Sequence, residues 1–344
     1  MDRMAQQPPQ REAMLYDRLA GQAVRCKLCG HRCVIRPGGY GRCRVRQNVD
    51  GTLYSRNYGY LVAANVDPIE KKPLYHVLPG STSMSIASAG CNFQCAFCQN
   101  WQISQLPREG SPEVGQCATP AQVVDAARRS RCASISYTYT EPTVFFEMAY
   151  DTAGLAAEAA LKNCFVSNGF LTPEAVRAIA PVLDAINVDL KTFRDETYRD
   201  VMKARLAPVL ECLETLVDEG VWVEVTTLVV PGMNDSDAEL RDIAGFIVDK
   251  LGPDVPWHVS RYHDDYQMSG RGSTPIATIE RAERLGREAG LRYVYPGNIA
   301  AGADTHCPNC GATVISRAPF GLKANRLADG ACGQCGHPIA GVWA

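Results

Sequence analysis

Fifteen cysteines are present, and eleven of them lie in three short groups with metal-ligand spacing. The first residues of the chain lack the apolar core of a secretory leader, so reduced thiols are favoured over disulfides. Four scattered cysteines are predicted to be small buried apolar residues without a chemical role: Cys117, Cys132, Cys164 and Cys212. The three groups are Cys91, Cys95 and Cys98 (the triplet), Cys26, Cys29, Cys33 and Cys43 (the N-terminal quartet), and Cys307, Cys310, Cys332 and Cys335 (the C-terminal quartet).

The triplet lies in the sequence AGCNFQCAFCQN, which has an aromatic residue directly before its last cysteine. Three thiolates can hold three irons of a 4Fe–4S cluster and leave the fourth iron open to a small molecule. Clusters that only carry electrons normally have four cysteine ligands, so an open iron indicates chemistry at the cluster. The alternative is a zinc site completed by a distant histidine.

The C-terminal quartet consists of two C-x-x-C knuckles, CPNCG and CGQCG. Four thiolates suit a closed tetrahedral zinc site, which would stabilise a segment too short to bury much core. An auxiliary iron–sulfur cluster is the main alternative, and a site without metal is the other.

The N-terminal quartet has four thiolates but no pair of matching knuckles, and His31 is a possible substitute ligand. Zinc is favoured, with an iron–sulfur cluster as the alternative. Seven basic residues surround it without an acid, which predicts a solvated face or a docking surface for an acidic protein or nucleic acid. They are Arg25, Lys27, Arg32, Arg36, Arg42, Arg44 and Arg46.

Composition bounds the class of protein. The chain has 344 residues, 46% hydrophobic and 21% charged, with a formal charge of −2. These values argue against a long disordered chain and against a globally basic nucleic-acid binder. No apolar run approaches the roughly 20 residues that span a bilayer. We therefore expect a soluble, cytoplasmic protein.

The elements between the outer quartets alternate between strands and helices, which predicts an α/β fold with a parallel sheet. A partial (β/α) barrel fits better than a dinucleotide-binding domain, because cysteines rather than G-x-G-x-x-G follow the first strand. We expect an N-terminal cysteine-rich module over 1–80, a barrel core over 81–300 and a zinc-ribbon-like module over 301–344. The segment DPIEKKPLYH, just before the barrel, is predicted to close the substrate side or to be a packed connector. Strands are expected at 83–89, 133–139, 164–168, 186–190, 221–230, 257–262 and 292–296.

Asp189 and Lys191 end the fourth predicted strand in the sequence NVDLK. Residues two apart on a strand share a face, here the barrel interior. A buried lysine there needs a negative partner, which is either Asp189 in an internal ion pair or an acidic group of a bound ligand.

The triplet resembles that of the radical S-adenosylmethionine (SAM) superfamily, in the branch of pyruvate formate-lyase activating enzyme. Over nearly its full length the chain is most similar to AmmeMemoRadiSam-system radical SAM enzymes, through CKLCGHRCVIRPGGYGRCRVRQN, DPIEKKPLYHVLPG, CNFQCAFCQNWQIS, YTYTEPTVFFE, NVDLK and THCPNCGATVISR. The resemblance implies a 4Fe–4S cluster that cleaves SAM to a 5′-deoxyadenosyl radical, which abstracts hydrogen from a substrate. A reductant such as flavodoxin or ferredoxin is the implied partner.

The resemblance also implies which residues hold SAM. Glu141 corresponds to the glutamate that engages the SAM ammonium, although Tyr139 and Thr140 stand where the activating enzymes have glycines. His263 resembles a histidine near the adenosine. The full implied set is Asn100, Glu141, Asn168, Asp189, Lys191 and His263. Without such roles, Glu141 is an acidic loop residue and His263 a loop histidine.

We therefore expect a radical SAM enzyme that is an oxidoreductase similar to the activating enzymes or an enzyme that modifies its substrate. Zinc is expected in addition to the 4Fe–4S cluster. A polypeptide substrate ranks above RNA, and a small molecule is the third possibility. A non-catalytic metal-binding or nucleic-acid-binding scaffold is the alternative from a different class.

Overall fold

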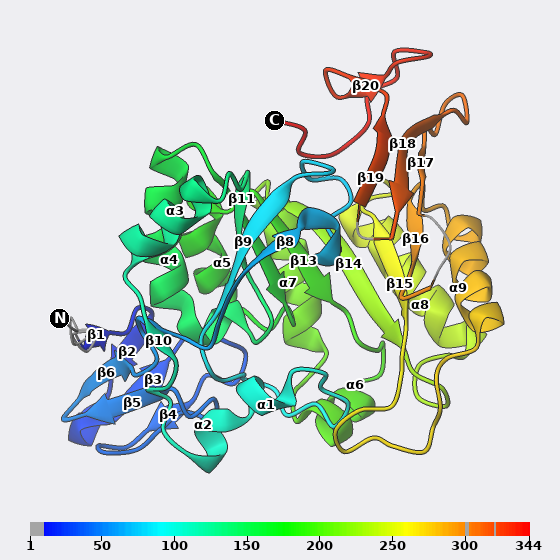
Figure 1. The fold of residues 1–344 in the computed structure, drawn as a ribbon. Helices are drawn as coiled ribbons and strands as arrows, with labels where there is room; N and C mark the ends of the chain where they lie inside the picture. Colours follow the sequence, from blue (N-terminus) through cyan, green and yellow to red (C-terminus); the bar gives the residue numbers. More distant parts are fainter. Residues whose placement is uncertain (1–9, 300–302, 320) are drawn as a thin grey trace.

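The computed structural model describes residues 10–299, 303–319 and 321–344, and its fold is drawn in Figure 1. The predicted domain boundary between residues 300 and 301 lies outside the described residues. Within them, no helix combines the length and the apolarity that crossing a membrane requires.

A sheet with the strand order β16-β15-β14-β13-β12-β11-β9-β8 forms the centre of the molecule (Figure 1). Within this sheet, each strand from β9 to β16 is parallel to its neighbours in that range, as in an open (β/α) barrel. This arrangement confirms the predicted α/β class and its parallel strands. The sequence did not indicate β8, which pairs antiparallel with β9 and extends the sheet back to Ala63. The strands are β8 (Ala63–Pro68), β9 (Thr82–Ala87), β11 (Ser134–Tyr137), β12 (Lys162–Ser167), β13 (Ala185–Asp189), β14 (Trp222–Val229), β15 (Trp257–Arg261) and β16 (Val294–Gly297).

Helices connect the parallel strands and cover the outer face of the sheet (Figure 1). Thr119 caps the first long helix with a capping box, and Thr172 caps α5 by accepting a hydrogen bond from Ala175 N. In both helices a proline follows the capping threonine, at the first helical position, where its missing N–H leaves no hydrogen bond unmade. The connecting helices are α3 (Pro120–Arg129), α4 (Phe146–Glu158), α5 (Pro173–Ile179), α7 (Ala207–Asp218), α8 (Asp237–Phe246) and α9 (Ile276–Glu288); the shorter α1 (Trp101–Ser104), α2 (Leu106–Glu109) and α6 (Asp195–Thr197) lie in loops.

Strand alternation gives the sheet one apolar and one polar face. Ile186 and Val188 belong to the main hydrophobic core together with Leu213 of α7. Asn187 and Asp189, on the opposite face of the same strand, point into the barrel interior. The interior is therefore polar, and polar side chains there can meet a ligand.

The two outer modules lie at opposite ends of the barrel (Figure 1). The N-terminal module joins the carboxyl ends of the strands, where Cys29 forms a bridge with Leu171 just after β12. The C-terminal module packs at the amino ends, where Thr305 Oγ1 lies 2.7 Å from the Tyr295 hydroxyl. Their small sheets are built from β1 (Arg11–Glu12), β2 (Tyr16–Arg18), β3 (Val24–Cys26), β4 (Val34–Ile35), β5 (Arg46–Val49) and β6 (Thr52–Ser55), and from β17 (Thr305–His306), β18 (Thr313–Ala318), β19 (Gly321–Asn325), β20 (Leu327–Ala328) and β21 (Ala331–Cys332).

Residues 69–78, here called the floor segment, close the barrel at the amino ends of its strands. The backbone N–H groups of Tyr75 and His76 donate to the buried Glu224 carboxylate at 3.0 and 2.8 Å. His258 Nε2 lies 2.6 Å from the same carboxylate. Burial alone would raise the pKa of Glu224, but the hydrogen bond and charge of His258 lower it overall. The predicted segment DPIEKKPLYH is thus a packed connector from residue 69 onward, on the side away from the triplet, and its first two residues end β8.

The floor segment is tied to the C-terminal residues. His76 Nδ1 lies 2.7 Å from Ala340 O and His76 Nε2 lies 2.7 Å from the Tyr295 hydroxyl. Val342 N donates to His76 O at 2.7 Å. These contacts fit a neutral imidazole that donates from Nδ1 and accepts at Nε2.

The free energy of unfolding should fall as the pH is lowered from about 6.5 to about 4. In this range His76 is protonated in the unfolded chain but not in the folded one. Burial lowers the pKa of His76 to about 4 from an ordinary value of 6.5. Between these values the unfolded state binds more protons, so unfolding becomes easier as the pH falls. The expected loss is about 3 kcal/mol, because one pKa unit corresponds to about 1.4 kcal/mol. Denaturant unfolding of the parent and of His76→Gln at a series of pH values measures it; equal pH slopes would contradict this assignment.

Candidate active site

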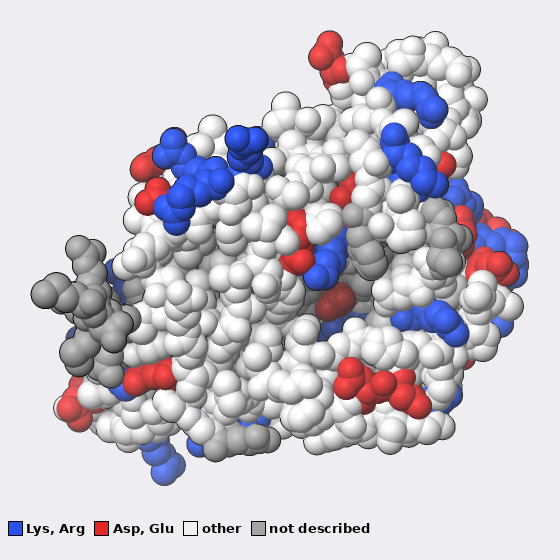
Figure 2. Space-filling view, in the orientation of Figure 1, with Lys and Arg blue, Asp and Glu red and all other residues white. Residues whose placement is uncertain are grey.

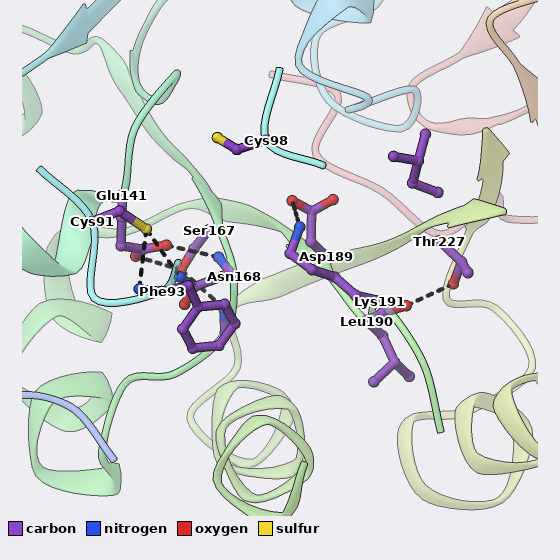
Figure 3. Close-up of polar contacts among 12 residues, drawn as sticks. Cys91, Phe93, Cys98, Glu141, Ser167, Asn168, Asp189, Leu190, Lys191 and Thr227 are labelled. Carbon is purple, nitrogen blue, oxygen red and sulfur yellow. Dashed lines mark hydrogen bonds and ion pairs between the residues drawn. The ribbon is translucent and has the colours of Figure 1, made fainter. Parts of the chain in front are cut away.

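The triplet lies on the loop after β9, at the carboxyl end of the sheet. Figure 3 shows the side chains of Cys91 and Cys98. Phe93 N donates to Cys91 Sγ at 3.3 Å, and Ser104 Oγ lies 3.3 Å from Cys98 Sγ. These contacts orient the sulfurs of Cys91 and Cys98. The first barrel strand therefore delivers the triplet to the end at which barrel chemistry normally occurs.

The triplet fits an iron–sulfur cluster better than a single ion. Burial raises the pKa of Cys91 well above its usual value and that of Cys95 to about 12, so metal binding must release protons. Among the residues that the structure describes, only the C-terminal quartet forms a group of three or more donors within 4.8 Å of one another. The triplet sulfurs stand further apart, as expected when each thiolate binds a different iron.

Glu141 ends the loop after β11 and braces the end of β12. Its Oε1 accepts hydrogen bonds from Thr143 N at 3.0 Å and Ser167 Oγ at 2.8 Å, and its Oε2 accepts one from Asn168 N at 2.8 Å. The residue is 1% exposed. Burial raises the pKa of Glu141, and these hydrogen bonds only partly offset the effect. The carboxylate therefore holds two strand ends in register beside the triplet.

Asn168 connects this brace to the triplet. Its Nδ2 donates to Asn92 Oδ1 at 2.7 Å and lies 3.7 Å from Cys91 Sγ. Asn168 Oδ1 accepts from Phe170 N at 3.1 Å, which fixes the orientation of the amide. The predicted residues Glu141 and Asn168 thus belong to one network with Cys91 (Figure 3).

Asp189 and Lys191 face this network across the site (Figure 3). Lys191 Nζ donates to Asp189 Oδ2 at 2.9 Å, the ion pair that the sequence offered as an alternative. Burial alone would lower the pKa of Lys191, but the charges of Asp189 and Cys95 raise it overall. Lys191 therefore stays charged close to the triplet. The face with β8 in front is hollowed near its centre, with acidic and basic side chains at the edge (Figure 2).

His263 and Asn100 lie at the outer edge of the site. His263 is exposed, and its Nε2 lies 2.8 Å from Nε2 of Gln99, the residue after Cys98. Asn100 is exposed at the start of α1, and its side chain makes no capping hydrogen bond. The structure thus brings His263 to the triplet loop and leaves the Asn100 side chain outside the network described above.

The C-terminal quartet has the geometry of a single-ion site. Cys307 Sγ lies 3.6 Å from Cys335 Sγ, and Cys310 Sγ lies 3.8 Å from Cys332 Sγ. Both knuckles close in the same way, because Gly311 N donates to Cys307 O and Gly336 N to Cys332 O. Gly311 and Gly336 have φ values of 74° and 73°, which explains the glycine after each knuckle. The four sulfurs fit one tetrahedral ion.

Metal analysis of anaerobically prepared protein should find about one zinc per chain bound at the C-terminal quartet. Cys307→Ser should release it, because a closed four-thiolate site loses a ligand. Cys117→Ser, which changes a scattered cysteine, is the matched control and should keep the zinc. Loss of iron instead of zinc in Cys307→Ser would identify an auxiliary cluster.

Among the described residues, the basic residues around the N-terminal quartet divide into those paired with a carboxylate and those that are exposed without such a pair. Lys27 pairs with Asp17 at 2.7 Å, and Arg32 pairs with Glu174. Arg46 is buried against Glu147 at 2.5 Å. Fewer basic side chains are therefore available to a binding partner than the sequence suggests. The exposed ones that remain are Arg25, Arg36, Arg42 and Arg44.

Three residues near the triplet were missed by sequence reasoning. Asn92 accepts the Asn168 hydrogen bond, Ser104 contacts Cys98, and Arg108 Nη2 donates to Cys91 O at 3.1 Å. The position of Asn92, directly after Cys91, was the one available signal. Arg108 acts on a backbone carbonyl, which carries no sequence signal.

Some known proteins are similar to this chain in the central barrel alone, and others over nearly its full length. A sequence model of the radical SAM superfamily matches residues 85–244. An uncharacterized protein of Methanocaldococcus jannaschii is 44% identical over 333 residues, which are 96% of this chain and 98% of that protein. The benzylsuccinate synthase activating enzyme of Thauera aromatica is 27% identical over 150 residues, 40% of this chain and 44% of the enzyme. The crystal structure of a radical SAM methyltransferase from Sphaerobacter thermophilus shares the fold, with a TM-score of 0.50 and 19% identity over 71% of this chain and 70% of that one.

Proposed function

The chain belongs to the radical SAM superfamily and is an enzyme, and from this premise we propose that it abstracts hydrogen from a polypeptide substrate. When bound, the 4Fe–4S cluster and SAM supply the 5′-deoxyadenosyl radical for this step. The motifs of the N-terminal module and of the strand ends support membership of the AmmeMemoRadiSam-system enzymes. A non-catalytic scaffold would leave the convergence of these strand-end residues on the triplet without a purpose.

The observation that carries the proposal is the placement of opposite charges on two sides of the triplet. Lys191 supplies a positive charge for the SAM carboxylate, and Glu141 is the candidate partner of the ammonium. Asn168 holds the Cys91 side of the site in place. His263 extends the site toward the region proposed for the adenosine. Together these contacts orient the cofactor, and small misplacements can cost about a hundredfold in rate.

Glu141 has a second role in this proposal, as a brace. Its carboxylate already accepts hydrogen bonds from four donors, which are Thr143 N, Thr143 Oγ1, Ser167 Oγ and Asn168 N. These bonds fix the orientation of the carboxylate, and the SAM ammonium would bind to the lone pairs that they leave free. The brace keeps β12 at a fixed distance from the triplet. Its position therefore links the stability of the strand end to the binding of SAM.

The barrel interior supports a polar substrate that enters at the carboxyl ends of the strands. The floor segment closes the other end. Asn187 Oδ1 and Thr226 Oγ1 are buried without hydrogen-bond partners among the described residues, and both lie on the interior face. An extended peptide offers backbone donors and acceptors to such groups. Similarity to the benzylsuccinate synthase activating enzyme favours a protein substrate.

Deuterium transfer tests the proposal. The anaerobic, iron-loaded protein is reduced with dithionite and given SAM together with protein, RNA or small-molecule fractions of deuterated cells. We expect 5′-deoxyadenosine to form and to gain deuterium from the protein fraction, with loss of the effect after protease treatment. Transfer only from RNA or from small molecules would overturn the proposed substrate, and absence of 5′-deoxyadenosine would overturn the reaction. The physiological donor is expected to be a flavodoxin or ferredoxin.

A further inference from the structure

All four thiols of the N-terminal quartet meet in one cavity. This cavity is lined by the quartet, by His31 and by Asn92 of the triplet loop. Burial raises the pKa of Cys29 well above its usual value, and the charges of Cys26 and Cys43 raise it further. Burial likewise raises the pKa of Cys43 to about 11. Four converging thiols form a metal site once their protons are released.

The spacing of these thiols differs from that of the C-terminal quartet. The C-terminal sulfurs all lie within 4.8 Å of one another, whereas no three donors of the N-terminal quartet do so, although all four are described. One zinc ion needs four sulfurs about 2.3 Å from a common centre. A 4Fe–4S cluster needs them further apart, because each sulfur binds a separate iron. Among the described residues, neither the N-terminal quartet nor the triplet has three sulfurs within the distance found in the C-terminal quartet.

Two buried donors at the cavity have no hydrogen-bond partner among the described residues. They are Arg46 Nε and Asn92 Nδ2, and each residue is 2% exposed. Both residues line the cavity. An unpaired buried donor costs about 1–3 kcal/mol, which favours an acceptor at this place. The sulfide and thiolate sulfurs of a cluster accept such hydrogen bonds, which tune its potential.

The N-terminal quartet lies beside the triplet and is joined to it by hydrogen bonds. Arg108 Nη1 donates to Arg42 O at 2.7 Å, and Arg108 Nη2 donates to Cys91 O at 3.1 Å. This one guanidinium therefore bridges the residue before Cys43 and the first residue of the triplet. His31 Nε2 also lies 2.9 Å from Asn92 O.

We propose that the N-terminal quartet binds a 4Fe–4S cluster that passes single electrons to the cluster at the triplet. A low-potential one-electron donor of the flavodoxin or ferredoxin class reduces the quartet cluster by one electron. The quartet cluster returns to its oxidised state when the triplet cluster takes that electron, and no bond forms or breaks in the transfer. The relay rests on the proposed function, whereas the metal site itself does not.

Metal content and electron paramagnetic resonance test the site. The full chain with Cys91→Ala, Cys95→Ala and Cys98→Ala is loaded with iron and sulfide without oxygen. We expect about four irons per chain to remain and a reduced-cluster signal to appear with dithionite, both lost when Cys29→Ser and Cys43→Ser are added. Cys117→Ser is the matched control and should change neither. A second zinc in place of this iron would overturn the proposal, even if the parent cleaves SAM.

Reduction kinetics test the relay in protein with an intact triplet. Cys29→Ser with Cys43→Ser should slow the reduction of the triplet cluster by reduced flavodoxin at least tenfold, without changing the affinity for SAM. Circular dichroism and retained C-terminal zinc show that this variant is folded. If it does not fold, Arg108→Gln, which removes the bridge and no ligand, replaces it and should slow the same reduction. An unchanged rate in a folded variant would overturn the relay. Absence of SAM cleavage by the parent would refute the proposed function instead.

Discussion

Cys95→Ala is expected to abolish the reductive cleavage of SAM and to leave the chain folded. The substitution removes one of three cluster ligands, and two thiolates cannot hold the cluster with one open iron. Cys95 is 8% exposed within the main core, so replacement by the smaller Ala costs only about 1 kcal/mol of stability. Anaerobic assay of 5′-deoxyadenosine after dithionite reduction measures the loss.

Cys132→Ala is the matched control for this result. Cys132 is also buried in the main core, but it lies outside the three cysteine groups. Its replacement should leave 5′-deoxyadenosine formation near the parent rate. If Cys95→Ala formed the product as fast as the parent, the triplet would not be the cluster site.

Lys191→Met should raise the dissociation constant for SAM about ten- to hundredfold without removing the cluster. Loss of a charge-assisted contact costs roughly 1.5–3 kcal/mol. Met keeps the length of the side chain but leaves Asp189 without its partner at 2.9 Å. Titration of the anaerobic, cluster-loaded variant with SAM, together with its iron content, measures both parts of the prediction.

Lys250→Met is the control for this charge change, because Lys250 is exposed on the outer face of the barrel. It should leave SAM affinity unchanged. Unchanged affinity in Lys191→Met would mean that Lys191 and Asp189 form only an internal ion pair.

Glu141→Gln should lower the stability of the chain as well as its affinity for SAM, since an amide cannot accept every hydrogen bond that the Glu141 carboxylate accepts.

The barrel could be predicted because its strands are short apolar runs separated by capped helices. All seven predicted strands are present, and Gly220 has the positive φ of 76° expected at a helix end. The strand β8 was missed because Ala63–Pro68 mixes polar, small and proline residues and lies at the sheet edge. Its partner strand lies beyond the floor segment, so no local hairpin signal marks it.

The site could be predicted where side chains carry the chemistry. The triplet and the Asp189–Lys191 pair follow from residue type and strand period. The contacts of Arg108 and His31 depend on backbone carbonyls of Cys91 and Asn92, which any residue provides. The choice of metal for the N-terminal quartet depends on the spacing of its sulfurs, which only a folded chain defines.

The floor segment also has a consequence for how the chain folds during synthesis. His76 is bonded to Ala340, 264 residues later, and Val77 bridges to Val342. Loop closure over such a separation is slow, and on the ribosome it must wait until residue 342 has emerged. Until then His76 and Val77 lack these partners and the floor segment is held only by its earlier contacts, such as those to Glu224, whereas the triplet and the strand ends around it are complete far earlier. An iron–sulfur cluster can therefore assemble at the triplet before residues 76 and 77 pair with residues 340 and 342. The order of chain segments thus allows metal loading to come before the final folding step.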